Sequence, residues 1–472
     1  MKKRRNSREK RSGRAVNSPL SRPSHSLRPA AANEMGGARK IQPSPTAPQL
    51  VRIEKPIYGG AFLARIGGKA SFVPLALPGE QLRVRIVDEK RGYASAEVEE
   101  IVDRSEQRVA PPCPHFGACG GCHYQHANYV AQLTYKREIL RETLERGGVY
   151  APEEIAVLAA EPWGYRNRIR LAFDAKGNVG YRGRRSHAVI PIAECPIAAP
   201  LLVRAGLAAG KVFSKLPSRF QASEISLFCD ARETGLLVSV TLAGDVKDRI
   251  DDFARALAGE TPELKGVEFA AEGGKGQAPR TVARWGESSL TYRAGDVDYR
   301  VDQGAFFQVN RWLIDALAER VTAHATGTLA WDLFSGVGLF ARKLADRFSC
   351  VIAVESAPQS TAALEHNLHG TGATAARSST LEFLQRGGGG DRPELIVVDP
   401  PRAGLGAETT ALLAEIAAPE MVYVSCDPAT LARDLRALTD AHRGARYVID
   451  QMTLADLFPQ TFHLETIVRL RR

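Results

Sequence analysis

The last third of the chain alternates short apolar runs with helix-like segments, and this pattern restricts the possible folds most strongly. From about residue 306, strands are indicated at "TLAWDLF", "CVIAVE", "ELIVVD" and "MVYVSC", and a last apolar run, "FHLETIVRL", closes the chain. Apolar strands separated by helices predict a parallel sheet that is covered on both faces. Ligands of such sheets bind at the carboxyl ends of the strands. We therefore expect a Rossmann-like α/β domain over residues 306–472, with its site at those ends.

Two β-rich regions and a basic tail precede this domain. Residues 49–105 contain short alternating runs between Gly and Pro turns, which indicate a small β-barrel of the OB type. Residues 106–305 begin with a cysteine cluster and a helix over 124–150, which we expect to pack on the α/β domain, and then become mostly strand-like. Residues 1–48 have no clear periodicity, so we expect a disordered tail.

The net charge of +10 belongs to this tail. Residues 1–50 hold 12 Lys/Arg and 2 Asp/Glu, which leaves 51 basic and 51 acidic residues in the remainder. A basic tail either anchors nucleic-acid phosphates nonspecifically or solubilises the protein. Because no apolar run reaches the ~18 residues of a membrane span and no secretory signal is recognisable, we expect a cytoplasmic protein without membrane association.

Residues 161–190 are a candidate nucleic-acid surface. The stretch "EPWGYRNRIRLAFDAKGNVGYRGRRSHAVI" carries seven Lys/Arg against two acidic residues. Four aromatic residues are interleaved with these charges: Trp163, Tyr165, Phe173 and Tyr181. An ordinary half-exposed sheet is the alternative, but the charge bias and the aromatic residues favour nucleic-acid binding.

The stretch "WDLFSGVGLFA" has the strand–glycine turn–helix order of a nucleotide-cofactor site. Gly336 and Gly338 allow a ligand to approach the backbone, and Glu355 ends the next strand, 19 residues after Gly336, where it can bind ribose hydroxyls. The spacing alone also fits a dinucleotide. Asp332 lies just before the turn, where it would repel a pyrophosphate but suit the cationic end of S-adenosylmethionine. With Asp399 at a further strand end, we predict S-adenosylmethionine as the cofactor.

In "VYVSCDPATLARDL", a buried strand runs directly into Cys426. The thiol is either a core residue or a nucleophile at the rim of the sheet. Asp427 can cap the following helix, and Pro428 suits its first position. A helix N-terminus favours a thiolate, whereas the neighbouring Asp427 charge opposes it, and the sequence does not decide between them.

The pattern Cys113-x5-Cys119-x2-Cys122 in a Gly/Pro-rich loop indicates metal ligands, and Cys195 is a candidate fourth ligand. Four thiolates hold zinc or an iron–sulfur cluster, and the spacing does not decide between the two. Nearby histidines are less favoured substitutes: His115, His123 and His126.

Six motifs occur in the order of a known family: "CPHFGACGGCHYQH", "FFQVN", "DLFSGVGLFA", "VVDPPRAG", "VYVSCDPATLARDL" and "LFPQTFHLETIV". Over residues 50–472 the chain resembles the bacterial RNA uracil-5-methyltransferases, most closely the 23S rRNA type. The predicted barrel resembles that group's TRAM domain, an RNA-binding module.

The resemblance implies a role for each site residue. Cys426 matches the nucleophile, which adds to carbon 6 of uracil and makes carbon 5 reactive, and Glu465 matches the general base. The residues that match cofactor contacts are Gln308, Phe334, Glu355 and Asp399. The family favours a 4Fe-4S cluster rather than zinc on the four cysteines: Cys113, Cys119, Cys122 and Cys195. Two family asparagines are replaced, one by Leu339 and the other near Ser379.

We therefore expect an S-adenosylmethionine-dependent methyltransferase that acts on carbon 5 of a flipped-out uridine in RNA, most closely 23S rRNA. Three alternatives stay open: the same reaction on tRNA, a cytosine methyltransferase, and an iron–sulfur RNA-binding protein whose methyltransferase domain is inactive. We expect a monomer without an obligate protein partner.

Overall fold

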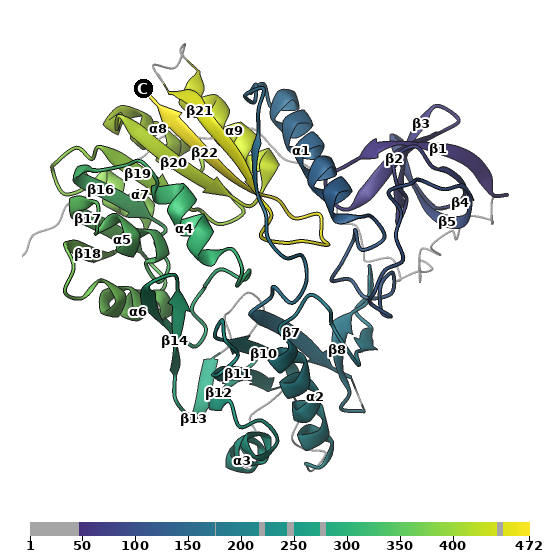
Figure 1. Cartoon of the computed structure of the whole chain (residues 1–472), viewed down its shortest axis with the longest axis horizontal. Coiled ribbons are helices and arrows are strands. Elements are labelled where there is room, and N and C mark those ends of the chain that lie inside the picture. Colours follow the sequence, from purple (N-terminus) through teal and green to yellow (C-terminus); the bar gives the residue numbers. More distant parts are fainter. Residues whose placement is uncertain (1–46, 175, 217–221, 243–249, 274–279, 441–446) are drawn as a thin grey trace, which may run out of the picture. The chain divides into compact units, whose positions relative to one another are not determined.

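The computed structural model describes residues 47–472 except 175, 217–221, 243–249, 274–279 and 441–446 (Figure 1). All but the last two residues of the predicted disordered tail, 1–48, lie outside the described residues. Within the described part, no helix has the length and apolarity required to cross a membrane.

The N-terminal strands form a closed barrel in the order β1-β2-β3-β5-β4. Alternate residues of β1, such as Val51 and Ile53, are buried together with Phe62 and Val73, which explains the alternating pattern of the sequence. The strands are β1 (Gln49–Pro56), β2 (Ala61–Ile66), β3 (Lys69–Pro74), β4 (Gln81–Glu89) and β5 (Tyr93–Asp103). The predicted small β-barrel is therefore present, and it has five strands.

Helix α1 (Tyr129–Arg146) follows the cysteine loop. Asn128 caps it by accepting a hydrogen bond from the backbone of Ala131, and Gly147 ends it. Its apolar face joins the core beneath α9 (Pro428–Thr439).

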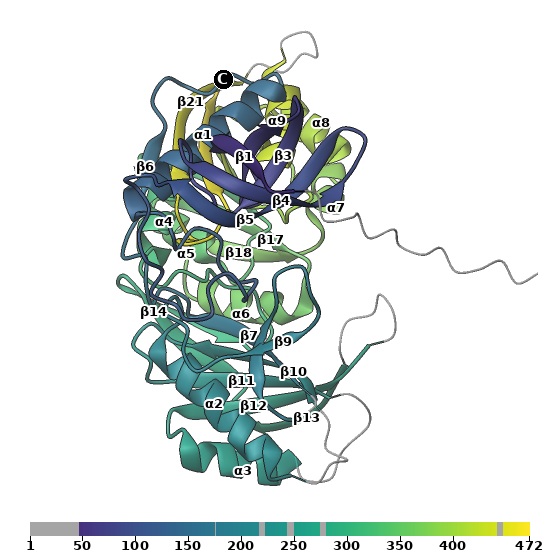
Figure 2. The same ribbon diagram turned by 90° about the vertical axis from the view of Figure 1, so that its right-hand side faces the viewer.

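The central sheet has seven strands in the order β13-β12-β11-β10-β7-β8-β9. Helices α2 (Pro200–Ser214) and α3 (Ile250–Glu260) pack into its core from one face (Figure 2). The strands are β7 (Arg168–Phe173), β8 (Val179–Arg182), β9 (Val189–Pro191), β10 (Ala222–Cys229), β11 (Leu236–Leu242), β12 (Leu264–Ala271) and β13 (Arg280–Gly286).

The C-terminal sheet has eight strands in the order β18-β17-β16-β19-β20-β22-β21-β6. The predicted parallel sheet is confirmed from β18 to β20, and β22 adds to β20 in the antiparallel direction. The strands are β6 (Ala156–Leu158), β16 (Gly327–Leu333), β17 (Phe348–Glu355), β18 (Ala373–Arg377), β19 (Leu395–Val398), β20 (Glu420–Ser425), β21 (Val448–Ala455) and β22 (Glu465–Arg471).

Helices cover both faces of this sheet, as the apolar strands require. One core contains residues of α4 (Ile314–Thr322), α5 (Leu339–Leu344) and α6 (Pro358–Leu368). The other contains residues of α1, α7 (Thr380–Gln385), α8 (Ala407–Ile416) and α9.

The segment predicted as the central domain, residues 106–305, also contributes to the C-terminal sheet. Strand β6 pairs with β21, and the hairpin of β14 (Ser289–Ala294) and β15 (Val297–Asp302) packs into the core next to α6. Strand β6 has no partner nearby in sequence, so local patterns do not reveal where it pairs.

Candidate active site

The carboxyl ends of four parallel strands meet at one cleft of about 560 Å³. Phe334 follows β16, and Glu355 is the last residue of β17. Asp399 follows β19, and Cys426 follows β20. All four side chains line the cleft, at the edge where the parallel topology predicts a ligand.

The two other residues predicted for this site reach the cleft from separate elements. Gln308 lies between β15 and α4, and its Nε2 is 3.4 Å from Asp399 Oδ2. Glu465 is the first residue of β22, and its side chain is buried. All six residues that the sequence places at the active site thus line one cleft.

The glycine turn requires its two glycines for different reasons. Gly336 has φ +57° and Gly338 φ +91°, in the left-handed region. A Cβ atom on Gly338 would lie 2.7 Å from Leu364 Cδ1, so no larger residue fits where α5 begins. At Gly336 no atom lies within 4 Å of an added Cβ, and the open space is available to a ligand.

Glu355 is fixed by backbone hydrogen bonds around this turn. Its Oε2 accepts from Gly336 N at 2.8 Å, and its Oε1 accepts from Ser356 N at 2.7 Å and Ala357 N at 2.6 Å. A carboxylate has about four acceptor sites, so Glu355 keeps capacity for a ligand hydroxyl.

Asp332 does not line the cleft, so its predicted position beside the cofactor is wrong. It lies beneath the glycine turn and stabilises it through hydrogen bonds. The side chain is fully buried and accepts from Ser335 Oγ at 2.6 Å and Ala341 N at 2.9 Å. Burial, and secondarily the Glu355 charge, raise the pKa of Asp332 to about 7 against the effect of these hydrogen bonds. Its influence on a ligand is therefore electrostatic and indirect.

Phe334 adopts φ +64°, a strained conformation for a residue with a side chain, and it lines the cleft. Of the two departures from the family pattern, Leu339 lines the cleft with an apolar side chain. Ser379 instead forms a capping box with Glu382 at the start of α7 and is not among the residues that line the cleft.

The predicted cap of α9 is confirmed. Asp427 Oδ1 accepts hydrogen bonds from Ala429 N and Thr430 N, each at 3.0 Å, and Pro428 is the first residue of the helix. Cys426 therefore lies directly before a capped helix N-terminus.

The surroundings nevertheless oppose ionisation of Cys426. Burial raises the pKa of its thiol from the ordinary 9 to about 12, and the charges of Glu465 and Asp399 add to this effect. Arg402 lowers it. The thiolate that the helix N-terminus was expected to favour is thus not the resting state.

Glu465 and Asp399 have a high proton affinity. Burial raises the pKa of Glu465 well above its ordinary value, and the Asp399 charge raises it further, whereas Arg402 lowers it. Burial, followed by the charge of Asp332, raises the pKa of Asp399. The cleft thus contains several acids close together in a poorly hydrated space.

The cationic side of the cleft was missed at the sequence level. Arg402 and His463 both line it, with Arg402 Nη2 3.0 Å from His463 Nδ1. Burial, and secondarily the Arg402 charge, lower the pKa of His463 to about 3, so its Nδ1 accepts from Arg402. The available signal was the arginine that follows the two prolines in "VVDPPRAG".

The four predicted metal-ligating cysteines line a second cavity of about 240 Å³, between the cysteine loop and the central sheet. The cavity also contains Arg166 and Tyr181, and Tyr181 Oη lies 3.6 Å from Cys195 Sγ. Among the residues that the structure describes, no three or more His, Cys, Asp or Glu side chains are arranged to hold a metal ion.

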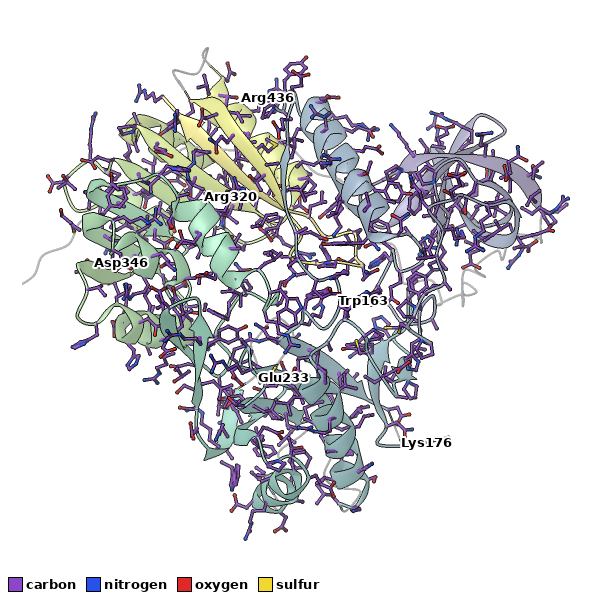
Figure 3. The ribbon with its side chains drawn as sticks, in the orientation of Figure 1. Trp163, Lys176, Glu233, Arg320, Asp346 and Arg436 are labelled. Carbon is purple, nitrogen blue, oxygen red and sulfur yellow. The ribbon has the colours of Figure 1, made fainter. Side chains whose placement is uncertain are left out.

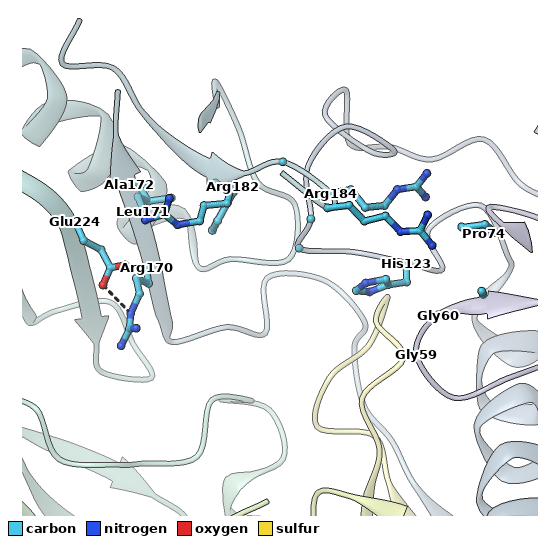
Figure 4. Close-up of a pocket in the computed structure, with 16 residues that line it drawn as sticks. Gly59, Gly60, Pro74, His123, Arg170, Leu171, Ala172, Arg182, Arg184 and Glu224 are labelled. Atoms are coloured by element: carbon cyan, nitrogen blue, oxygen red, sulfur yellow. Dashed lines mark ion pairs between the residues drawn. The ribbon is translucent and has the colours of Figure 1, made fainter. Parts of the chain in front are cut away.

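A third cleft, of about 540 Å³, lies between the barrel and the central sheet (Figure 4). Figure 4 shows Arg184 and His123 between the Arg170–Glu224 ion pair on one side and the barrel on the other. The further basic residues that line it are Arg182 and Arg185. The concentration of arginines indicates a surface for an anionic polymer.

Two of the four aromatic residues of the 161–190 segment are buried and are not available for the predicted stacking surface. Tyr165 and Phe173 are core residues, and Tyr181 faces the four-cysteine cavity. Trp163, labelled in Figure 3, accepts a hydrogen bond at its carbonyl oxygen from Trp312 Nε1 at 3.0 Å. Four arginines of this segment line the arginine cleft (Arg170, Arg182, Arg184 and Arg185), and Tyr181 lines it as well, whereas the rings of Tyr165 and Phe173 stabilise the fold.

Two family models match the chain. The model of the tRNA (Uracil-5-)-methyltransferases matches residues 392–472, which contain Cys426 and Glu465. The model of the TRAM domain matches residues 48–98, which cover most of the barrel.

Relatives match over most of their length. The chain is 33% identical to a 23S rRNA (uracil(1939)-C(5))-methyltransferase of Halomonas elongata, over 88% of this chain and 87% of the relative. It is 34% identical to an enzyme of the same name from Azoarcus sp., over 89% of this chain and 99% of the relative. A tRNA (uracil-54, C5)-methyltransferase of Pyrococcus abyssi, solved in complex with S-adenosyl-L-homocysteine, has the same fold, with a TM-score of 0.71, 24% identity and coverage of 89% of this chain and all of that one.

Proposed function

Because the chain belongs to the family of RNA (uracil-5-)-methyltransferases, we propose that it methylates a uridine of 23S rRNA, with Cys426 as nucleophile and Glu465 as general base. The reaction itself, transfer of a methyl group from S-adenosylmethionine to carbon 5 of uracil in RNA, is that of the family. The observation that carries the residue assignment is that a thiol and a buried carboxyl from different strands line the same cleft.

The residues of the cleft fit S-adenosylmethionine. Gly336 leaves space for a ligand, Glu355 keeps acceptor capacity for ribose hydroxyls, and Phe334 offers an aromatic face. Gln308 and Asp399, which lie side by side, would bind the remaining polar groups. The cofactor supplies a methyl group on a cationic sulfur, and this positive charge complements the acids of the cleft.

Cys426 would begin the reaction on the uracil ring. Its thiol gives up its proton to solvent water, the sulfur forms a bond to carbon 6, and the carbon 5–carbon 6 electrons move through the ring onto the carbon 4 oxygen, so that carbon 5 becomes nucleophilic. The thiol needs assistance for this step because its pKa is raised to about 12. Arg402, which lowers that pKa, is the residue that we assign to this assistance.

Glu465 would complete the reaction after carbon 5 has received the methyl group. Its carboxylate removes the carbon 5 proton, the carbon 5–carbon 6 double bond re-forms, and the sulfur–carbon 6 bond breaks to return Cys426. Burial raises the proton affinity of Glu465, which suits a group that must take a proton from carbon. Arg402 opposes this effect by lowering the pKa of Glu465.

The RNA would lie along the arginine cleft of Figure 4 and enter the active site as a flipped-out base. Arginines contact phosphates without regard to sequence, which suits a long structured RNA. Phe306 lines the mouth of the active site and is 60% exposed, so its ring is available for stacking on a base.

The four cysteines would hold a 4Fe-4S cluster. Four thiols around one cavity are the donor set of such a cluster and also of zinc, and the family resemblance favours the cluster. Methyl transfer moves no electrons to an acceptor, so we assign the cluster to positioning the loop next to the arginine cleft.

A tRNA is the second candidate substrate, because the matching family model is named for tRNA. The test uses radiolabelled S-adenosylmethionine with rRNA and tRNA fractions from cells that lack 5-methyluridine. Label in 5-methyluridine of 23S rRNA supports the proposal, label in tRNA alone reassigns the substrate, and no label in 5-methyluridine refutes it. Cys426→Ala should abolish transfer, whereas Cys350→Ala, in β17, is the matched control.

The cluster is tested separately on protein purified without oxygen. A brown protein with a broad absorbance near 400 nm and stoichiometric iron and sulfide supports the assignment. A colourless protein with one equivalent of zinc contradicts it. Cys122→Ser should lose the colour, and Cys229→Ser, at a buried strand position, is the control.

A further inference from the structure

The turn between β1 and β2 places Tyr58 of the barrel against the start of α9. Tyr58 Oη donates a hydrogen bond to Asp427 Oδ2 at 3.2 Å. Its ring packs edge-on against Phe462, with 5.5 Å between the ring centroids. The turn itself is closed by a hydrogen bond from Ile57 N to Ala61 O at 3.0 Å. A barrel residue thus contacts the C-terminal domain next to the proposed nucleophile.

Two positions of this turn require glycine. Gly59 and Gly60 have φ +104° and +85°, which a residue with a side chain rarely adopts. A Cβ atom on Gly60 would lie 2.7 Å from His123 Cδ2. The two glycines therefore let the turn approach the cysteine loop and direct Tyr58 towards α9.

The two carboxylate oxygens of Asp427 accept hydrogen bonds from different donors. Oδ1 accepts from Ala429 N and Thr430 N, and Oδ2 accepts from Tyr58. Burial, and secondarily the charge of Asp427, raise the pKa of Tyr58, so its hydroxyl stays protonated and donates. The carboxylate next to Cys426 is thus held in one orientation, and part of its charge is offset.

The Phe462 contact extends this arrangement to the cationic side of the active site. The ring of Phe462 packs against His463 in a tilted arrangement, with 4.3 Å between the ring centroids, and His463 accepts a hydrogen bond from Arg402. One tyrosine therefore contacts both segments that determine the charge around Cys426.

We propose that Tyr58 is a positioning residue for Cys426: its hydroxyl holds Asp427 in the helix cap and keeps the carboxylate from opposing formation of the thiolate. The inference rests on the proposed role of Cys426 as nucleophile. It assigns the barrel a part in the chemistry, in addition to any contact with RNA.

The pH dependence of kcat should follow from the ionisable groups around the Cys426 thiol. The ionisable groups that face Cys426 or its neighbours are Asp427, Tyr58, Asp399, Arg402, His463 and Glu465. In Tyr58→Phe, the uncompensated charge of Asp427 adds to the acids of this set. The thiol should then ionise at a higher pH, and the rising limb of the pH–kcat profile should shift to higher pH.

The experiment compares Tyr58→Phe with Tyr150→Phe, whose side chain is 82% exposed. We expect Tyr58→Phe to lower kcat about tenfold, the size of one lost hydrogen bond to a charged group, while KM for RNA stays within about twofold. In an Asp427→Asn background, where the cap oxygen stays and the charge is removed, the same substitution should cost less than about twofold.

Unchanged kcat in Tyr58→Phe overturns the inference, and so does a loss confined to KM for RNA, which would make Tyr58 an RNA contact. An equal loss in the Asp427→Asn background overturns it as well. If the unmodified protein transfers no methyl group, the proposed function fails, but the inference is still tested by alkylation of Cys426, which Tyr58→Phe should slow about threefold or more at pH 8.

Discussion

The thiol of Cys426 should react slowly in protein that contains no cofactor. Burial and the charges of Glu465 and Asp399 raise its pKa from 9 to about 12, and Arg402 opposes them only in part. A nucleophile is usually pictured as an activated thiolate. The arrangement in this cleft predicts the opposite for the resting enzyme, and the difference is measurable.

The expected decrease in the alkylation rate of Cys426 follows from two opposing effects. A pKa of 12 rather than 9 lowers the thiolate fraction at pH 8 from about 10⁻¹ to about 10⁻⁴. A thiolate of higher pKa is intrinsically more nucleophilic, and a Brønsted coefficient of about 0.4–0.5 recovers roughly 20-fold over this range. Cys426 should therefore be alkylated about 50-fold more slowly than an ordinary exposed thiol.

The assay follows iodoacetamide alkylation by mass spectrometry. The tryptic peptide that begins at Ala403 and ends at Arg433 contains Cys426 and no other cysteine. The same peptide in urea-unfolded protein is the reference. Because the thiol pKa is raised, the rate in the folded protein should keep rising with pH above 9, where the reference begins to level off.

Arg402→Gln supplies the directional test. Loss of this positive charge should slow alkylation several-fold further, whereas Arg392→Gln, at an exposed position, should not change it. In Arg402→Gln the tryptic peptide that contains Cys426 begins at Gly387, and it again contains no other cysteine. A folded protein whose Cys426 levels off near pH 9 would refute the reasoning, and an Arg402→Gln variant with an unchanged rate would remove Arg402 from its assigned role.

Three further predictions address other parts of the site. Glu465→Gln should accumulate a covalent protein–RNA adduct through Cys426, visible as a shifted band in denaturing gels, because the carbon 5 proton is no longer removed. Lys136→Met should lower the free energy of unfolding by about 3–5 kcal/mol in urea titrations, because it leaves Asp456 without its fully buried partner at 2.6 Å. Gly338→Ala should weaken binding of S-adenosylhomocysteine about tenfold or more by calorimetry, because its Cβ would lie 2.7 Å from a leucine of α6 and shift the turn.

Each of these has a matched control. Glu408→Gln, at an exposed position of α8, should give no adduct. Lys176→Met changes an exposed lysine, labelled in Figure 3, and should alter stability by less than about 0.5 kcal/mol. Gly370→Ala has the same left-handed strain at φ +76° without a neighbour within 4 Å, so it should reduce stability but not cofactor affinity. Equal effects in a variant and its control would contradict the corresponding prediction.

The sequence predicts the C-terminal sheet and the residues at its strand ends well because both depend on local patterns, whereas Gln308, Phe334 and Glu465 are predicted only from the family resemblance. Apolar strands end at Glu355 and Cys426, and parallel strands bring their ends to one edge whatever lies between them. The helix cap at Asp427 is likewise a property of three adjacent residues.

The other features of the site depend on contacts between segments that are distant in sequence, and local patterns do not predict such contacts. Tyr165 and Phe173 alternate with arginines as an RNA-binding face would, yet they are buried by helices and loops from elsewhere in the chain. Asp332 has the expected position along the chain but points beneath the turn. The pairing of Arg402 with His463 joins residues 61 positions apart, and no spacing rule predicts it.

The thiol of Cys426 illustrates why the electrostatics of the cleft had to come from the structure. The sequence supplies a helix N-terminus that favours a thiolate and one acidic neighbour that opposes it. The fold adds burial and two further carboxyls, from β22 and the end of β19, and these outweigh the helix. Each acid retains its proton more strongly because the others are near. A positive charge beside these groups would favour the ionised form of each of them. The positive charge of S-adenosylmethionine would therefore favour ionisation of the same thiol that burial and the two carboxyls keep protonated, and activation of the nucleophile would be tied to cofactor binding.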